Sequence, residues 1–142
     1  MSTMRKAFSL IELLIVIAIL GLLVGLIGPA LIDQFGKAKK DLTCTQMGGI
    51  SQTLDMFKLD NGVYPTTDEG LEALISNPDP DKYPNYSSTP YFQKGKMPKD
   101  SWKRKFEYIS TGNDFDLISL GADGREGGDG ESADIYFSKC QK

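Results

Sequence analysis

Histidine is absent from this chain of 142 residues, and cysteine and tryptophan are rare, with two copies and one copy. The absence of histidine excludes the Ser-His and Cys-His nucleophile pairs, histidine zinc ligands and the commonest general base. Acidic side chains outnumber basic ones, 19 against 16, which gives a net charge of −3. This balance argues against a nucleic-acid-binding protein, because such a protein needs a positive surface for the phosphates.

Charge is also nearly absent from residues 8–32, which form an apolar run with a single acid, Glu12. A helix of this length, at about 1.5 Å per residue, is long enough to cross a hydrocarbon core about 30 Å thick. A removed signal peptide would have an apolar core of only about 7–15 residues. We therefore expect a transmembrane segment, with a signal peptide and a plain membrane anchor as the simpler alternatives.

Glu12 is the most informative residue of this run. A carboxylate inside an apolar membrane segment costs at least about 2.5 kcal/mol on insertion scales, and such residues usually have a partner. A chain that needed only an anchor would carry leucine at this position. We therefore expect the Glu12 carboxylate to pair with another group.

The helix is predicted to continue past the membrane segment to about residue 59. Apolar residues recur at alternating steps of four and three, which places them on one face of a helix, with polar residues on the other face. Pro29 is expected to kink or loosen the helix, and Gly62 is expected to end it. The predicted buried stripe consists of Leu31, Phe35, Ala38, Leu42, Gln46, Ile50, Leu54 and Phe57.

Short elements are predicted in the rest of the chain. Thr66 and Glu69 fit a capping box before a short second helix. Residues 76–104 combine prolines with several aromatic residues, which predicts an ordered loop and not a disordered one. Trp102 lies in a basic cluster at residues 94–105, which we interpret as a surface turn and not as a nucleic-acid site.

Three strands are predicted near the C-terminus, where apolar and polar residues alternate between turn residues. The predicted strands are residues 106–109, 115–120 and 134–137. One long helix packed on a small antiparallel sheet is an α+β architecture.

Residues 121–134 contain five glycines and five acids. Glycines let a backbone fold tightly and turn its carbonyls inward, and Ca²⁺ takes about six to eight oxygens from carboxylates, carbonyls and hydroxyls. The EF-hand spacing is absent, and a glycine-rich β-helix repeat is present only in part and only once. The segment predicts either an irregular calcium-binding loop or a flexible acidic loop.

The residues around Glu12 resemble the processing site of type IV pilins and type II secretion pseudopilins. Residues 7–12 (AFSLIE) follow the family pattern of a small residue, phenylalanine and Thr-Leu-Ile-Glu, with alanine for the usual glycine and serine for threonine. The resemblance implies that a prepilin peptidase cuts between Ala7 and Phe8, removes residues 1–7 and leaves an N-methylated amine. It also implies that Glu12 pairs with the Phe8 amine of a neighbouring copy.

The remainder of the chain is similar to the major pseudopilins of type II secretion. The similarity rests on YPTT at residues 64–67, GLEAL at 70–74, SLGADG at 119–124 and ADI at 133–135. Residues 100–103 (DSWK) depart from the family's usual Asp-Pro-Trp-Gly, so we expect a different turn there.

In that family the C-terminal loop binds one structural calcium ion, so the resemblance implies Ca²⁺ as the bound metal. Ala133 stands where many relatives have a further acid, for which Asp129 or Glu131 would substitute. The implied ligands are the carboxylates of Asp123, Asp129 and Asp134, the carbonyls of Leu120 and Arg125, and Ser132.

The resemblance also implies the organisation of the chain and its partners. Residues 8–32 are the transmembrane and filament-core segment, and residues 33–142 form a periplasmic head. Copies are expected to polymerise from the bacterial inner membrane into a pseudopilus that drives export of folded proteins. The implied partners are further copies of the chain, minor pseudopilins, an inner-membrane assembly platform and an outer-membrane secretin. The expected function is structural and not enzymatic.

The two cysteines, Cys44 and Cys140, would lie in an oxidising exported compartment. A bridge between them would close a loop of roughly 95 residues, worth up to about 4.7 kcal/mol in the chain-entropy model. Two free thiols are the alternative, because the spacing does not give the geometry that a disulfide needs.

Two other functions fit part of the pattern. A major type IV pilin shares the N-terminal motif, but it more often has its cysteines within the C-terminal sheet and a longer head. A membrane-tethered enzyme would use Asp123 and Asp134 as a carboxylate pair, as glycosidases do. No further catalytic set accompanies these two residues in the sequence.

Overall fold

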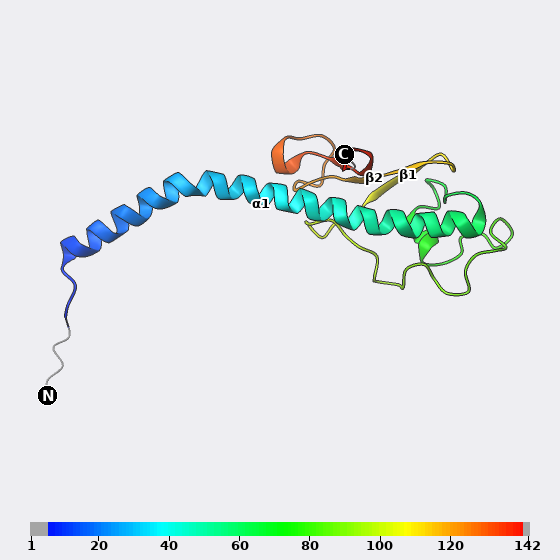
Figure 1. Ribbon diagram of the computed structural model, residues 1–142, viewed down its shortest axis with the longest axis horizontal. Coiled ribbons are helices and arrows are strands. Elements are labelled where there is room, and N and C mark those ends of the chain that lie inside the picture. Colours follow the sequence, from blue (N-terminus) through cyan, green and yellow to red (C-terminus); the bar gives the residue numbers. More distant parts are fainter. Residues whose placement is uncertain (1–5, 141–142) are drawn as a thin grey trace, which may run out of the picture. The chain divides into compact units, whose positions relative to one another are not determined.

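The computed structural model describes residues 6–140 (Figure 1). Residues 1–5 of the predicted leader lie outside this range. The fold is the predicted α+β class, with one long helix, a small antiparallel sheet and three predicted strands that are all present. In chain order the elements are α1 (Leu10–Asn61), η1 (Leu71–Leu74), β1 (Glu107–Ser110), β2 (Phe115–Ser119), η2 (Gly130–Ser132), β3 (Ile135–Tyr136) and α2 (Phe137–Cys140).

The chain divides into two units between Lys37 and Ala38. In the first unit, α1 is long and apolar enough to cross a membrane, and none of its most apolar stretch is buried within the chain. Leu10 and Val24, for example, are 78% and 70% exposed. The helix continues through Pro29. An exposed apolar surface of this size requires lipid or other protein chains to cover it.

The buried stripe of α1 in the second unit differs from the predicted stripe. Ile50, Leu54 and Phe57 are completely buried, as predicted, but the stripe continues through Met47 and Thr43. The prediction was wrong in this part because steps of three and four lead back from Ile50 equally well to either set of positions. The predicted members that are exposed or partly exposed are Leu31, Phe35, Ala38, Leu42 and Gln46.

Thr43 is buried because its hydroxyl has partners. Its Oγ1 lies 2.8 Å from the Ser101 hydroxyl and accepts the Ser101 N–H at 3.2 Å. The Ser101 hydroxyl in turn donates to the Lys39 carbonyl at 2.7 Å. A buried hydroxyl that is hydrogen-bonded costs little free energy. This contact between α1 and a turn 58 residues later in the chain decides which face of the helix is buried.

The sheet has the order β1-β2-β3, and both pairings are antiparallel. Tyr108 of β1, Leu117 of β2 and Ile135 of β3 are buried and join the stripe of α1 in one hydrophobic core. Figure 1 shows β1 and β2 alongside the second half of α1. The Tyr108 hydroxyl donates to the Pro65 carbonyl at 2.8 Å, which ties the sheet to the segment that follows α1.

The loop of residues 76–104 is ordered by aromatic contacts, as predicted. The rings of Tyr83, Tyr86 and Tyr91 lie 5.1, 5.9 and 5.5 Å from the ring of Phe57. The pairs with Tyr83 and Tyr86 are edge-to-face, and the pair with Tyr91 is tilted. Edge-to-face pairs contribute about 0.5–1.5 kcal/mol each beyond the burial of area. Phe57 therefore anchors a long loop that contains little secondary structure.

The second helix is shorter than predicted, although its capping box is present. The Thr66 N–H donates to Glu69 Oε2 at 2.8 Å, and the Glu69 N–H donates to Thr66 Oγ1 at 3.2 Å. Gly70 then adopts φ +61° and ψ −167°, which is not a helical conformation. The capped segment therefore remains a turn, and only η1 follows it.

Glu69 has further partners from the aromatic loop. Its carboxylate accepts hydrogen bonds from the Tyr83 hydroxyl at 2.6 Å and from Lys82 Nζ at 2.7 Å. Burial opposes the ionisation of Glu69, but the hydrogen bonds from Lys82, Tyr83 and the Thr66 N–H outweigh it and lower the pKa of Glu69 to about 2. The ionised carboxylate thus joins the capped turn before η1 to the loop.

A Glu69→Gln variant is expected to be less stable than the wild type by about 1–2 kcal/mol at pH 7, because it loses charge-assisted hydrogen bonds. The pKa of Glu69 in the folded chain lies below its ordinary value of 4.5, so this stabilisation is complete above pH 4.5 and disappears as the pH falls towards 2. Thermal melts at pH 7 and near pH 2 measure the difference. The exposed Asp68→Asn is the control, and an equal loss at both pH values would contradict this assignment.

Candidate assembly and calcium sites

The predicted cleavage bond lies directly before the long helix. Residues 6–9 form neither helix nor strand, and α1 begins at Leu10. The Phe8 side chain is 79% exposed. The Ala7–Phe8 bond is therefore in an exposed segment outside the helix, which is where a peptidase could reach it.

Glu12 also belongs to a helix cap, which the sequence analysis did not predict. The Glu12 N–H donates to Ser9 Oγ at 3.2 Å, and the Leu13 N–H donates to the Ser9 carbonyl at 3.1 Å. Ser9 and Glu12 thus occupy the two positions of an S-x-x-E capping box, a signal that was present in the sequence. The three ion pairs formed by the described residues do not include Glu12.

The segment between β2 and β3 folds back on itself. Gly121 has φ +67°, and a Cβ atom there would lie 2.7 Å from the Ala133 carbonyl oxygen and 2.9 Å from that of Glu131. The Ala122 N–H donates to the Glu131 carbonyl at 2.9 Å. Glycine is required at position 121 because the two sides of the loop approach so closely.

Asp134 and Asp123 are placed differently in this loop. Asp134 accepts the Gly127 N–H on Oδ2 at 3.0 Å, while its Oδ1 is buried and has no hydrogen-bond partner. Asp123 is exposed and accepts the Arg125 N–H on Oδ1 at 3.0 Å. A buried carboxylate oxygen without a protein partner is costly, and a cation or a water molecule is the kind of group that would satisfy it.

The other predicted ligands differ in how exposed their residues are to solvent. Leu120 and Ser132 are partly buried, and Arg125 and Asp129 are exposed. Within residues 6–140, no group of three or more acidic, cysteine or histidine side chains is close enough to hold a metal ion. A calcium ion here would therefore need backbone carbonyls and a hydroxyl besides the carboxylates, which is a donor set that Ca²⁺ accepts.

Sequence reasoning missed the buried carboxylate that positions this loop. Asp100 is 5% exposed. Its Oδ1 accepts the N–H groups of Trp102 at 3.0 Å and Arg104 at 2.8 Å, and its Oδ2 accepts the Ser119 hydroxyl at 2.7 Å. Asp100 therefore joins the turn of residues 100–104 to the end of β2.

Arg104 extends this connection into the loop. Its Nη1 donates to the carbonyls of Gly121 at 2.7 Å and Ala122 at 2.9 Å. A Cβ atom at Gly124 would lie 2.8 Å from the guanidinium group, so the loop backbone packs directly against Arg104. The acidic loop therefore begins against the guanidinium group of Arg104.

Lys103 is the one non-glycine residue with positive φ among the described residues, at +63°. In the family pattern that the sequence resembles, glycine stands at this position. The left-handed conformation costs a residue with a Cβ atom about 1–2 kcal/mol. The turn therefore has a conformation that suits glycine, although the chain carries lysine.

Cys44 of α1 and Cys140 of α2 form a disulfide in the structure, and their Cα atoms are 5.7 Å apart. The segment before Cys140 is also attached to the sheet. The Ser138 hydroxyl donates to the Asp116 carboxylate at 2.7 Å, and the Phe137 ring stacks on Phe115 with centroids 6.2 Å apart. The C-terminal segment is thus connected to both the helix and the sheet.

These features define a class of protein. An exposed apolar helix that follows a processing motif and leads into a small antiparallel sheet is the architecture of a pilin-like subunit. A family model described as a prokaryotic N-terminal methylation motif matches residues 2–28. A second model, described as type II secretion system (T2SS) protein G, matches residues 30–138. The chain belongs to the T2SS protein G family, the major pseudopilins.

Individual relatives agree with this assignment. The chain is 42% identical over 139 residues to type II secretion system core protein G of Vibrio cholerae, with coverage of 95% of this chain and 94% of that protein. It is 40% identical over 134 residues to the core protein G of Pseudomonas aeruginosa, with 92% and 93% coverage.

A solved structure has the same fold. The crystal structure of the major pseudopilin from the type 2 secretion system of enterohaemorrhagic Escherichia coli has a TM-score of 0.64 and is 30% identical. The match covers 77% of this chain and 90% of that one. The family assignment decides against the alternative of a type IV pilin.

A Lys103→Gly variant is expected to be more stable than the wild type by about 0.5–1 kcal/mol. The gain from relieving the left-handed conformation exceeds the entropy that glycine adds to the unfolded chain. Chemical denaturation of the purified chain measures this difference. Lys105→Gly, two residues further along, is the matched control and is expected to be destabilising. A loss of stability in both variants would show that the conformation at Lys103 carries no strain.

Proposed function

We propose that this chain is the structural subunit of a pseudopilus that grows from the bacterial inner membrane and drives export of folded proteins. The observation that carries the proposal is the match to T2SS protein G over residues 30–138, joined to an apolar helix that the chain itself leaves uncovered. Before assembly this helix spans the inner membrane, and the head of residues 33–142 is in the periplasm. In the filament, the helices of neighbouring copies cover one another.

The subunit acts with the partners that a secretion pseudopilin needs. A prepilin peptidase cuts between Ala7 and Phe8, and an inner-membrane platform extracts the processed chain. Minor pseudopilins and an outer-membrane secretin complete the machinery. The proposed role of the chain is structural, because the relatives that it matches over more than nine-tenths of its length are core proteins of a secretion system.

Glu12 selects the position of each copy relative to the next by pairing with the methylated amine of Phe8. Both charges are costly in an apolar environment, so each stabilises the other there. The helix cap is a separate feature, because Ser9 Oγ accepts the backbone N–H of Glu12 and this bond does not involve the Glu12 carboxylate. The cap and the proposed pairing can therefore be tested separately, since glutamine keeps the backbone N–H and removes only the charge.

Glu12→Gln is expected to abolish filament formation while the helical content of the chain in detergent is unchanged, because only the charge is lost. Ser9→Ala weakens the cap by about 1 kcal/mol and keeps the carboxylate, so it is expected to assemble. Electron microscopy of overproduced filaments and circular dichroism measure the two effects. Normal filaments from Glu12→Gln, or equal damage from both variants, would overturn the pairing.

Calcium stabilises the loop of residues 120–134 by neutralising carboxylates that would otherwise repel one another. The buried Oδ1 of Asp134 supports this proposal, because it lacks any other partner. The proposed ligands are Asp123, Asp129 and Asp134, the Leu120 and Arg125 carbonyls, and Ser132. Arg104 holds the start of the loop through hydrogen bonds to the backbone carbonyls. The proposed ligands therefore need to move less when calcium binds.

Asp134→Asn is expected to lower calcium affinity by roughly tenfold or more, since it removes the most buried charged donor. Glu126→Gln, an exposed residue of the same loop with the same change in charge, is the control. Isothermal titration and thermal melts with and without chelator measure binding and stabilisation. Identical melting of the wild type in calcium and in chelator would reject a structural calcium site.

The disulfide and the calcium loop hold opposite ends of the C-terminal segment. Asp134 lies directly before β3, and Cys140 ends α2. Because β3 pairs through only two residues, the sheet alone holds this segment weakly. We propose that the bridge between Cys44 and Cys140 keeps the segment attached to α1 when the loop is empty.

A further inference from the structure

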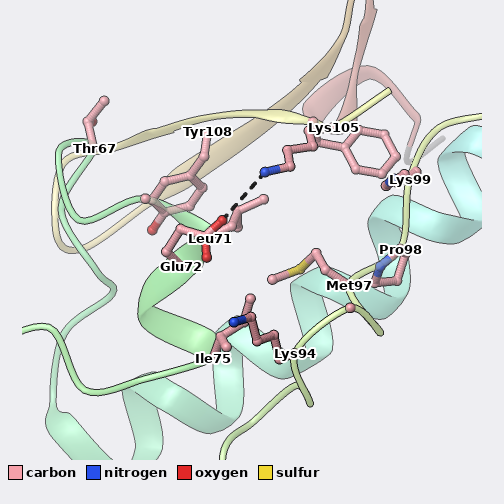
Figure 2. Close-up of a pocket in the computed structure, with 13 residues that line it drawn as sticks. Thr67, Leu71, Glu72, Ile75, Lys94, Met97, Pro98, Lys99, Lys105 and Tyr108 are labelled. Carbon is pink, nitrogen blue, oxygen red and sulfur yellow. Dashed lines mark ion pairs between the residues drawn. The ribbon is translucent and has the colours of Figure 1, made fainter. Parts of the chain in front are cut away.

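A disulfide lies in the wall of one hollow of the head. This hollow has a volume of about 470 Å³ and lies between α1 and α2, and Cys44 and Cys140 both line it. Another hollow, of about 460 Å³, lies between η1, the segment of residues 94–99 and β1, and Figure 2 shows apolar side chains and lysines around it. The hollow between α1 and α2 differs in that it offers a reactive bond to molecules in solution. We call it the disulfide hollow.

Small side chains on α1 keep the disulfide hollow open. Gly48 lies about one helical turn after Cys44, and a Cβ atom added to it would meet no described residue within 4 Å apart from its neighbours in the helix. The Thr45 hydroxyl donates back to the Asp41 carbonyl at 2.9 Å. Cys44 and Cys140 are both partly exposed. Because exchange requires a thiolate to reach a sulfur atom, the bridge is accessible to an external thiol.

The inner side of the bridge lies against the core. Cys140 Sγ is 4.0 Å from the sulfur atom of Met47, which is completely buried. Phe137, at the start of α2, lines the hollow and stacks on Phe115 of β2. The bridge therefore joins α2 to the buried stripe of α1 on one side and faces the hollow on the other.

The chain between the bridge and the proposed calcium site is short. Only residues 135–139 separate Asp134 from Cys140, and they form β3 and most of α2. Besides the bridge, this segment is held by two residue pairs between β2 and β3, and by exposed hydrogen bonds from Ser138 to Asp116. A pairing of two residues is weak by itself. Opening the bridge therefore loosens the segment that positions Asp134.

We propose that the bridge between Cys44 and Cys140 controls the calcium affinity of the acidic loop. When the bridge is closed, β3 and α2 hold Asp134 in position for the ion. When it is open, part of the binding free energy is used to order residues 134–140, so the affinity falls. Coupling between two sites is reciprocal, so bound calcium makes the bridge harder to reduce by the same factor. This inference rests on the proposed function, from which it takes the calcium ligands.

The reaction is thiol–disulfide exchange with the dithiol of an oxidoreductase. A thiolate of the reduced partner attacks one sulfur of the bridge, forms a mixed disulfide and releases the other cysteine as a thiolate. The second thiolate of the partner then attacks the partner's own sulfur in the mixed disulfide and releases the remaining cysteine. Two electrons and two protons thus pass from the dithiol to Cys44 and Cys140, and the partner leaves as a disulfide. The reverse reaction, with an oxidised partner, closes the bridge.

This coupling sets the order in which the head matures. An oxidising exported compartment closes the bridge first. The closed bridge then gives the loop its full affinity for calcium, which satisfies the buried Oδ1 of Asp134. A head that is still reduced binds calcium weakly.

Calcium titration of the full-length chain in detergent tests the coupling. The oxidised wild type is compared with the wild type reduced by dithiothreitol and with the double variant Cys44→Ser/Cys140→Ser. We expect the dissociation constant for calcium to rise roughly tenfold in both open forms, which is within the usual range of coupling between sites. Dithiothreitol is expected to change nothing further in the double variant, which controls for binding of calcium by the reagent.

Glu69→Gln is the control for a general loss of stability, because it weakens the head away from the C-terminal segment. It is expected to keep the wild-type calcium affinity. Hydrogen exchange is expected to rise on reduction in residues 120–136 but not at Leu54 of the core. Equal affinities of the oxidised and reduced wild type, an equal loss of affinity in Glu69→Gln, or lost protection at Leu54 would overturn the coupling alone. An oxidised wild type that binds no calcium would overturn the proposed calcium site and this inference with it.

The rate of reduction by dithiothreitol tests the disulfide hollow as the route to the bridge. Gly48→Phe places a ring in the hollow and is expected to slow reduction roughly tenfold, because the thiolate loses its access. Gly49→Phe is the matched control, since Gly49 is exposed and lies outside the lining, and it is expected to react at the wild-type rate. Equal rates for the two variants would overturn the hollow as the route. An equilibrium extent of reduction that does not fall when calcium is added would overturn the coupling.

Discussion

The packing of one stripe of α1 against the rest of the head is the interaction on which the structure depends. Met47, Ile50, Leu54 and Phe57 are completely buried, and the sheet, η1 and the aromatic loop all contact them. Each of these parts is too small to be stable alone, since the strands have two to five residues. The helix therefore serves as the surface on which the other parts become ordered.

The N-terminal part of the same helix has an apolar surface that the chain itself does not cover. In the first unit none of the most apolar stretch is buried, so the free energy of covering it has to come from lipid or from other copies. In the proposed function, membrane insertion and polymerisation satisfy this requirement in turn. The proposed pairing of Glu12 would make the position of each copy in the filament selective.

Buried and half-buried acids organise the head. Asp100 stabilises the turn that leads to Arg104. Glu69 joins the turn before η1 to the aromatic loop. Asp134 has one buried carboxylate oxygen without a hydrogen-bond partner. In each case the carboxylate connects segments that are far apart in the sequence or irregular in structure. Hydrogen bonds to charged groups are stronger than neutral ones, which suits segments that have few ladder hydrogen bonds.

Much of the candidate site was visible in local patterns. The processing motif, the glycine-rich acidic loop and the approximate strands depend on residues close together in the chain, so short-range rules identify them. The extent of the second helix was overestimated because a capping box predicts a helix start, whereas the conformation of Gly70 ends it at once. The role of Asp100 was missed because the partners of its carboxylate are two backbone N–H groups and a hydroxyl, whose approach depends on the folded turn.

The sequence by itself determined the long helix, the apolar first half with one acid, the α+β class and the family pattern at both ends. These follow from periodicity and composition, which are properties of neighbouring residues. Only the tertiary structure decided which face of α1 is buried, because Thr43 and Leu42 fit the helical period equally well and the contact with Ser101 selects Thr43. It also decided that Cys44 meets Cys140, since this contact depends on how distant segments pack.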